Sequence, residues 1–201
     1  MKKIVITLTT IVCLVISINY VLKQYTTRST DVPATSAMIK ILISKVAEHP
    51  ALNATTQGII DALEAGGYKQ GKNLDLRVES AQANGALAAQ IASKFVNQDP
   101  DVVIGVGTIS AQSFMQSARA EKVKLIFSTV TDPLGAQLVQ TLKKPGNNTS
   151  GVSNFVDLEP QLTLFKQLQP KLLRLGFLYN PGEGNSVSII NKLEALCPQF
   201  G

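Results

Sequence analysis

The chain has 201 residues, of which 45% are hydrophobic and only 16% are charged, and its formal net charge is +5. So much Ile, Leu, Val and Ala excludes an intrinsically disordered chain, and two cysteines with ordinary Gly and Pro contents exclude a disulfide-rich or collagen-like scaffold. The basic excess does not predict a nucleic-acid partner, because much of it lies in residues 1–37, tryptophan is absent and no basic cluster falls on one predicted face.

The N-terminal segment combines a basic start with a long apolar run. Lys2 and Lys3 precede residues 4–22, which contain no charged side chain. As a helix this run approaches the roughly 30 Å thickness of a bilayer core, and the lysines place its amino end in the cytoplasm. The sequence therefore predicts an exported protein, with a signal peptide or an N-terminal membrane anchor at residues 1–22 and a flexible linker at residues 23–37.

Behind the linker, short β-branched runs alternate with amphipathic stretches. We predict strands at residues 38–43, 74–78, 101–106, 123–127, 150–153 and 172–179. We predict helices that begin at Pro50 and after Asn84, and further helices at residues 108–119, 135–142, 158–168 and 185–196. This alternation is typical of βαβ units, so the expected fold class is α/β with a doubly wound, open parallel sheet.

Ligands of such sheets bind beyond the carboxyl ends of the strands, and small or polar residues come after these ends here. The segments are residues 48–50, 107–110, 131–133 and 180–186. The backbone N–H groups where a helix opens at Ser110 and Ala111 suit an anion such as a carboxylate. Asp132, Glu183 or both suit an ammonium, which together predicts a site for an amino acid or a similar small zwitterion. Asp132 before Pro133 is also a common turn-opening pair, so a purely structural role stays open.

No motif for catalysis, a cofactor or a metal accompanies these segments. Gly105 and Gly107 lack the third glycine and the acidic partner of a dinucleotide fingerprint. His49 is the single histidine and has no second His or Cys at metal-ligand spacing, so it is either a loop residue or a ligand contact. Ser110 has no recognisable His and acid partners. We therefore expect a protein that is not an enzyme and needs neither cofactor nor metal.

Five segments carry a combined pattern that none of them would carry alone. They are EHPAL at residues 48–52, GYKQGKN at 67–73, TVTDPLGA at 129–136, KPGNNTSGVS at 144–153 and GFLYNPGEGNS at 176–186. In this order and spacing they resemble the ABC-transporter substrate-binding proteins of the tryptophan/tyrosine-binding type. The resemblance extends from about residue 38 to residue 196.

The resemblance implies a type I periplasmic-binding-protein fold, in which two lobes close on a small solute. Residues 38–153 would form the first ligand-binding lobe and residues 154–201 an incomplete, truncated second lobe. It also implies delivery of the solute to an ABC permease in the membrane with its ATPase. The positions that match the family's ligand contacts are Thr108, Ser110, Ala111, Asp132, Pro133, Asn180, Glu183, Asn185 and Ser186.

Two other functions stay open beside a solute-binding component of an importer. A membrane-anchored extracytoplasmic sensor or regulatory domain would use the same lobe without transport, and a truncated remnant would bind nothing. A partial second lobe would also leave apolar faces on residues 158–196 uncovered.

Overall fold

The computed structural model describes residues 38–117, 123–146 and 148–200. The predicted leader or anchor and the predicted linker lie outside these residues. Within the described ranges, none of the helices combines the length and the apolar character that a membrane crossing requires.

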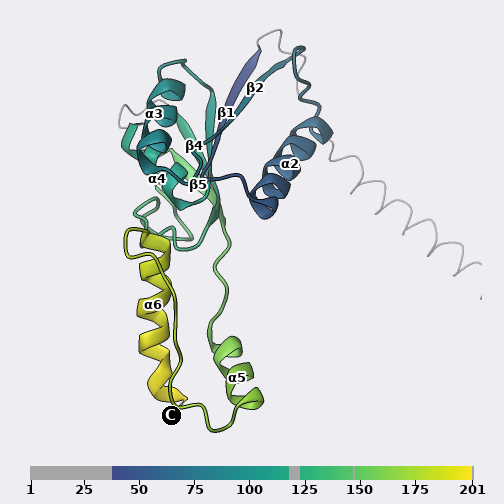
Figure 1. Cartoon of the computed structure of the whole chain (residues 1–201). Helices are drawn as coiled ribbons and strands as arrows, with labels where there is room; N and C mark the ends of the chain where they lie inside the picture. Colours follow the sequence, from purple (N-terminus) through teal and green to yellow (C-terminus); the bar gives the residue numbers. More distant parts are fainter. Residues whose placement is uncertain (1–37, 118–122, 147, 201) are drawn as a thin grey trace, which may run out of the picture.

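A five-stranded parallel sheet forms the body of the protein (Figure 1). Its strands are β1 (Ile39–Lys45), β2 (Leu74–Ser80), β3 (Val102–Val106), β4 (Lys124–Val130) and β5 (Thr149–Ser153). They have the order β2-β1-β3-β4-β5, and every neighbouring pair is parallel. The strand order therefore reverses between β1 and β3, where a doubly wound sheet binds its ligands.

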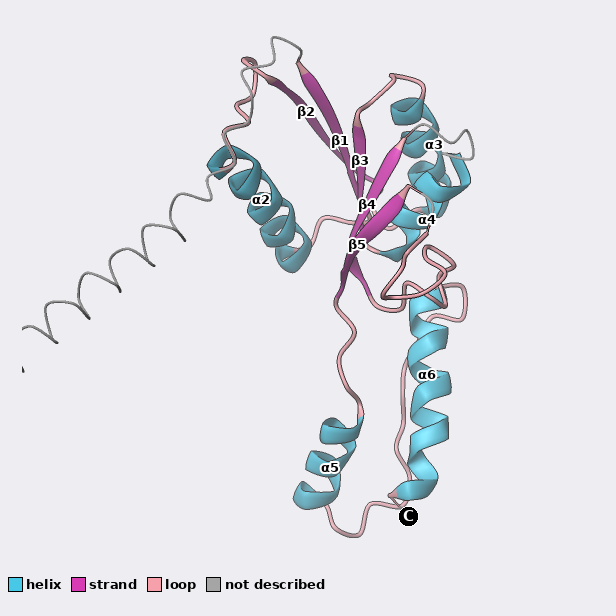
Figure 2. Cartoon of the chain, turned by 180° about the vertical axis from the view of Figure 1, so that it is seen from behind, coloured by secondary structure: helices cyan, strands magenta, loops and turns pink. Residues whose placement is uncertain are grey.

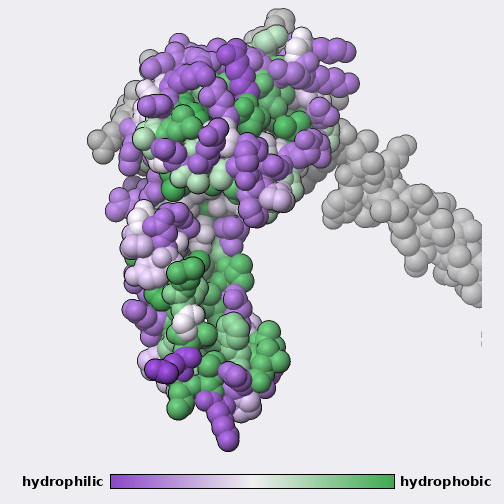
Figure 3. All heavy atoms as spheres, in the orientation of Figure 1, coloured by the Kyte–Doolittle hydropathy of each residue, from purple (hydrophilic) through white to green (hydrophobic). Residues whose placement is uncertain are grey.

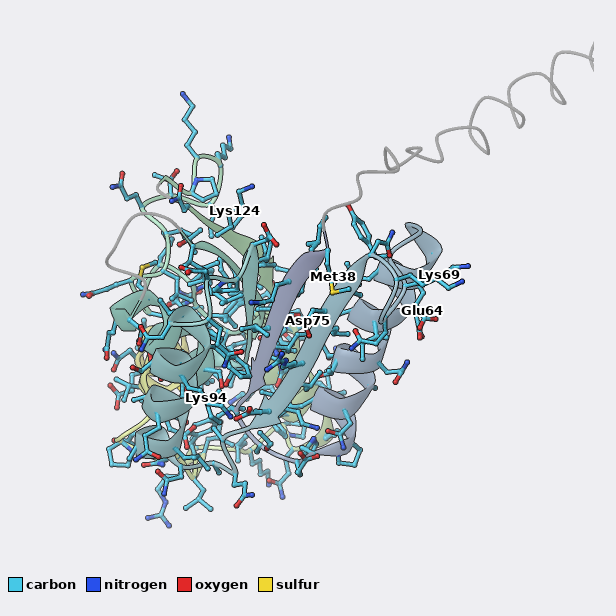
Figure 4. All side chains as sticks on the ribbon, turned by 90° about the horizontal axis from the view of Figure 1, so that it is seen from above. Met38, Glu64, Lys69, Asp75, Lys94 and Lys124 are labelled. Atoms are coloured by element: carbon cyan, nitrogen blue, oxygen red, sulfur yellow. The ribbon has the colours of Figure 1, made fainter. Side chains whose placement is uncertain are left out.

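Helices cover both faces of this sheet (Figure 2). One face carries α2 (Pro50–Ala65), and the other carries α3 (Gly85–Val96) and α4 (Thr108–Ser117). Seen from above, Glu64 of α2 and Lys94 of α3 lie on opposite sides of the sheet (Figure 4). The predicted α/β fold with a doubly wound parallel sheet is thus confirmed.

The alternation of side chains along β1 supplies a core to each face. Leu42 packs into a buried cluster with Phe95 of α3 and Phe114 of α4. Ile41 and Ile43 point the other way, into the cluster that α2 covers. Because both faces of the sheet are covered, the consecutive residues Ile41, Leu42 and Ile43 of β1 are all apolar and buried, as in central parallel strands.

Polar side chains define where the first helices begin. The Nδ1 atom of His49 accepts a hydrogen bond from the backbone N–H of Ala51 at 3.3 Å, which makes His49 the N-cap of α2. Asn84 caps α3 through the N–H of Leu87 at 3.0 Å, as predicted. The single histidine is therefore an exposed helix cap.

The helix predicted at residues 135–142 is wrong, because residues 133–137 form consecutive turns. The Oδ1 atom of Asp132 accepts from the N–H of Gly135 at 2.9 Å and fixes the first turn. Gln137 then adopts the left-handed region with φ 58°, which a right-handed helix cannot continue. The spacing of apolar residues predicted a helix, but the hydrogen bond of Asp132 and the backbone of Gln137 favour turns.

The strand predicted at residues 172–179 is also wrong. This segment belongs to no sheet of the described structure and runs beside α6 (Figures 1 and 2). A strand needs a neighbour that pairs with its backbone N–H and C=O groups, and a β-branched or aromatic composition does not supply one.

Residues 154–200 extend away from the sheet and contain α5 (Glu159–Leu168), α6 (Gly184–Leu196) and a 3-10 turn at Cys197–Gln199. Leu158 and Leu162 pack against Leu193 in one small cluster. Many large apolar side chains here stay exposed, and several gather over this part of the surface (Figure 3). They include Phe155, Val156, Leu164, Phe165, Leu168, Leu173, Leu178 and Tyr179. The expected uncovered apolar faces are confirmed.

Gly105 of β3 allows α4 to approach the sheet closely. A Cβ atom at this position would lie 2.5 Å from the Cα atom of Ala111, closer than real Cβ contacts come. Gly58 in α2 is the opposite case, because an added Cβ would meet nothing within 4 Å. A side chain at Gly105 would therefore disturb packing, whereas a side chain at Gly58 would affect only helix propensity.

We expect Gly105→Ala to lower the free energy of unfolding by about 2 kcal/mol, because α4 must move off the sheet. Gly58→Ala should instead raise it by up to about 1 kcal/mol, since alanine favours a helix. Urea unfolding followed by circular dichroism measures both. Equal effects of the two substitutions would contradict this account of α4.

Candidate functional site

A cavity of about 200 Å³ lies at the carboxyl ends of the strands. Its walls come from the ends of β1, β4 and β5, the first turn of α2, the junction of β3 with α4, and the start of α6. The lining residues are Val46, Leu52, Gly107, Thr108, Ile109, Thr129, Thr131, Asn154, Glu183 and Asn185. This is the edge of the sheet at which the fold predicts a ligand.

The junction of β3 with α4 aims a helix N-terminus at the cavity. Gly107 has φ 94°, and a Cβ there would lie 2.7 Å from the Cγ1 atom of Val46, so glycine alone fits. The C=O of Gly107 accepts from the N–H of Ala111 at 3.1 Å and begins the helix. The N–H groups of the first three helical residues have no partner inside the helix. Since Thr108 and Ile109 line the cavity, this positive helix end suits an anion.

Ser110 and Ala111 are fully buried and do not line the cavity. The hydroxyl of Ser44 donates to the Oγ of Ser110 at 3.3 Å, so the Ser110 side chain contacts β1. Ala111 packs in a cluster with Phe127 and Val130. Their side chains position the start of α4 on the sheet.

Glu183 supplies a negative charge to the cavity wall. Its carboxylate accepts from the Nδ2 of Asn180 at 3.0 Å and from the Nδ2 of Asn185 at 3.5 Å. Both partners are neutral amides, and within the described residues Glu183 makes no ion pair. The carboxylate is thus oriented without being neutralised, and it can receive an ammonium.

Asp132 comes after β4 but does not line the cavity. Besides its bond from Gly135, its carboxylate accepts from the hydroxyl of Ser188 at 2.5 Å and lies 3.5 Å from the Nζ of Lys192. Burial alone would raise the pKa of Asp132, but these three partners outweigh it and lower the pKa below its usual value. Asp132 therefore attaches α6 to the sheet.

Of the remaining predicted site residues, some line this cavity and others do not. Thr108, Glu183 and Asn185 line it. Pro133 is buried in the turn after β4, and Ser186 is half-buried in the first turn of α6. Asn180 does not line the cavity, and its side chain donates a hydrogen bond to the carboxylate of Glu183.

Several lining residues were not predicted. Thr131 and Asn154 come directly after β4 and β5, so the strand-end rule could have found both. Val46 and Leu52 come after β1 in the same way. Thr129 lies within β4, and nothing in the sequence indicates that it reaches the cavity.

Comparison with known proteins shows what the chain is similar to. The model of a family described as ABC transporter substrate binding protein matches residues 40–201. A protein named tyrosine-binding protein, from Clostridioides difficile (strain R20291), is 38% identical over 151 residues, which are 75% of this chain and 43% of that protein.

Two solved structures share the fold at high similarity. A conserved domain protein from Vibrio cholerae O1 biovar eltor has a TM-score of 0.78 and 41% identity over 82% of this chain and 55% of that one. An ABC domain from Streptococcus pneumonia, solved in complex with L-Trp, has a TM-score of 0.77 and 30% identity over the same shares, 82% and 55%. The chain thus spans about half the length of the relatives it matches.

We expect Asp132→Asn to weaken the attachment of α6 at neutral pH and to keep the turn after it, since Asn caps as well as Asp. The pKa of Asp132 in the folded state lies below the unfolded value of about 3.9, so the ionised carboxylate favours the folded state. This stabilisation is present above that pH and is lost as the pH falls through the folded-state pKa.

Denaturant unfolding of both forms tests this expectation. At neutral pH the free energy of unfolding of the wild-type chain should exceed that of the variant by about 1 kcal/mol. This difference should vanish in strong acid, where Asp132 is protonated. A difference that persists in acid would show that the charge of Asp132 is not the cause.

Proposed function

We propose, because the chain belongs to the family of ABC transporter substrate-binding proteins, that it captures an amino acid in the cavity at the strand ends. One observation carries this proposal. The cavity brings the positive N-terminal end of α4 and the unneutralised carboxylate of Glu183 to the walls of one small space. Opposite charges on the walls of one cavity suit a zwitterion.

The α4 end is the proposed partner of the ligand's carboxylate. The backbone N–H groups of Thr108 and Ile109 are oriented donors, and Gly105 and Gly107 hold that helix start against the sheet. Glu183 is the proposed partner of the ammonium, with Asn180 and Asn185 holding its oxygens. Hydrogen bonds between charged groups are the strong ones, and both ends of an amino acid would make them here.

The apolar part of the cavity supports a large apolar or aromatic side chain on the ligand. Val46, Leu52 and Ile109 form this part of the wall. The names of two relatives agree with it, since one is a tyrosine-binding protein and another was solved with L-Trp. We therefore place this chain's solute among the aromatic amino acids.

Capture would involve closure of two parts of the chain around the solute. Residues on both sides of residue 153 in the chain line the cavity, so a ligand touching both favours the closed arrangement by its differential affinity. In the proposed role the loaded protein delivers its solute to an ABC permease and ATPase outside the cytoplasm. The basic start and the apolar run of residues 4–22 support export.

Calorimetric titration of the whole chain with the twenty amino acids tests the capture. We expect an aromatic amino acid to bind, and Glu183→Gln to weaken its binding by about ten- to a hundredfold through loss of a charge-assisted bond. Glu194→Gln is the matched control, because Glu194 is exposed in α6, the helix that begins directly after Glu183, and does not line the cavity.

Each outcome of this titration has a distinct meaning. Unchanged affinity in Glu183→Gln would remove Glu183 as the partner of the ammonium. Failure of every amino acid to bind would overturn the amino-acid proposal itself.

Export is tested by a reporter that is active only outside the cytoplasm. Fusion of residues 1–40 to this reporter should give activity, and the same reporter without these residues should not. An inactive fusion that stays soluble in the cytoplasm would contradict the importer role.

A further inference from the structure

Thr129 is a cavity residue with an unusual backbone. β4 and β5 pair at Phe127 with Gly151 and again at Val130 with Ser153, so β4 has one residue more than β5 in this interval. Within the resulting bulge Thr129 has φ 54°. Among the described residues other than glycine with positive φ, it is the one that is β-branched, and such side chains rarely adopt this region.

The hydroxyl of Thr129 is equally unusual. Its Oγ1 atom is buried and has no hydrogen-bond partner, the only such side-chain atom found in the part of the chain that the structure describes. Leaving a buried hydroxyl unpaired is destabilising, as is the strained backbone. A bulge re-aims the side chain that it carries, and Thr129 lines the cavity.

Neighbouring polar groups at this edge do have partners in the protein. The hydroxyl of Ser153 donates to the C=O of Thr131 at 3.1 Å, and the N–H of Asn154 donates to the C=O of Val130 at 3.1 Å. Packing at the end of β4 therefore does satisfy polar atoms, and Thr129 is the exception.

We infer that the hydroxyl of Thr129 hydrogen-bonds a polar group on the side chain of the bound amino acid and thereby selects among aromatic ligands. This inference rests on the proposed function, in which α4 and Glu183 already bind the two charged ends. A hydroxyl that only the correct ligand satisfies rejects an analogue that lacks the matching group. Tyrosine and tryptophan carry such a group, and phenylalanine does not.

Titrations of wild type, Thr129→Val and Thr129→Ser with L-tyrosine, L-tryptophan and L-phenylalanine test the inference. Wild type should bind tyrosine or tryptophan about tenfold more tightly than phenylalanine. Thr129→Val should lose this preference with unchanged affinity for phenylalanine, and Thr129→Ser should keep it.

Thermal unfolding without ligand separates this role from a structural one. Valine keeps the β-branch and the backbone strain but removes the unpaired hydroxyl, so the midpoint of Thr129→Val should not fall. Thr56→Val is the control. The hydroxyl of Thr56 donates to the C=O of Leu52 at 2.8 Å outside the cavity, so its loss should lower the midpoint and leave affinity unchanged.

Two results would overturn the inference while the proposed function stands. One is a Thr129→Val chain that binds all three ligands as wild type does. The other is a chain that loses affinity for all three equally, since the hydroxyl would then contact the part they share. If wild type binds no amino acid, the proposed function falls and this inference falls with it.

Discussion

The close contact between α4 and the strand ends is the constraint on which the cavity depends. Gly105 leaves no room for a Cβ beneath Ala111, and Gly107 turns the chain with φ 94° against Val46. Together they place the unpaired N–H groups of a helix at the edge where the chain leaves β1 and β3 toward opposite faces of the sheet. A helix that began one turn farther away would leave that edge without a positive end.

Two carboxylates near this edge differ because their partners differ. Asp132 has a lysine, a hydroxyl and a backbone amide as partners, which lower its pKa. Glu183 has only two amides, which orient it and leave its charge. Asp132 thus pairs with a cation of α6, and the carboxylate of Glu183 makes no ion pair within the described residues.

The attachment of α6 also determines which residues share the cavity. Asp132 contacts Ser188 and Lys192, and the Nζ of Lys192 lies 3.9 Å from the centre of the Phe155 ring. These contacts bring the start of α6, with Glu183 and Asn185, to the strand ends. Elsewhere residues 154–200 have little packing, and their apolar side chains are largely exposed. A few polar contacts therefore position Glu183 and Asn185 at the cavity wall.

The sequence by itself determined the alternation of strands and helices, the parallel sheet, the Asn84 cap, the family and the place of Thr108 directly beyond the end of β3. These depend on local patterns, namely the apolar period, the capping side chains and the residue types just beyond each strand. Only the tertiary structure decided that residues 172–179 stay unpaired, that Asp132 contacts α6 and that Thr129 reaches the cavity. Each of these depends on a partner elsewhere in the fold, because a strand needs a neighbour, a carboxylate takes the nearest cation and a bulge exists only relative to the strand beside it.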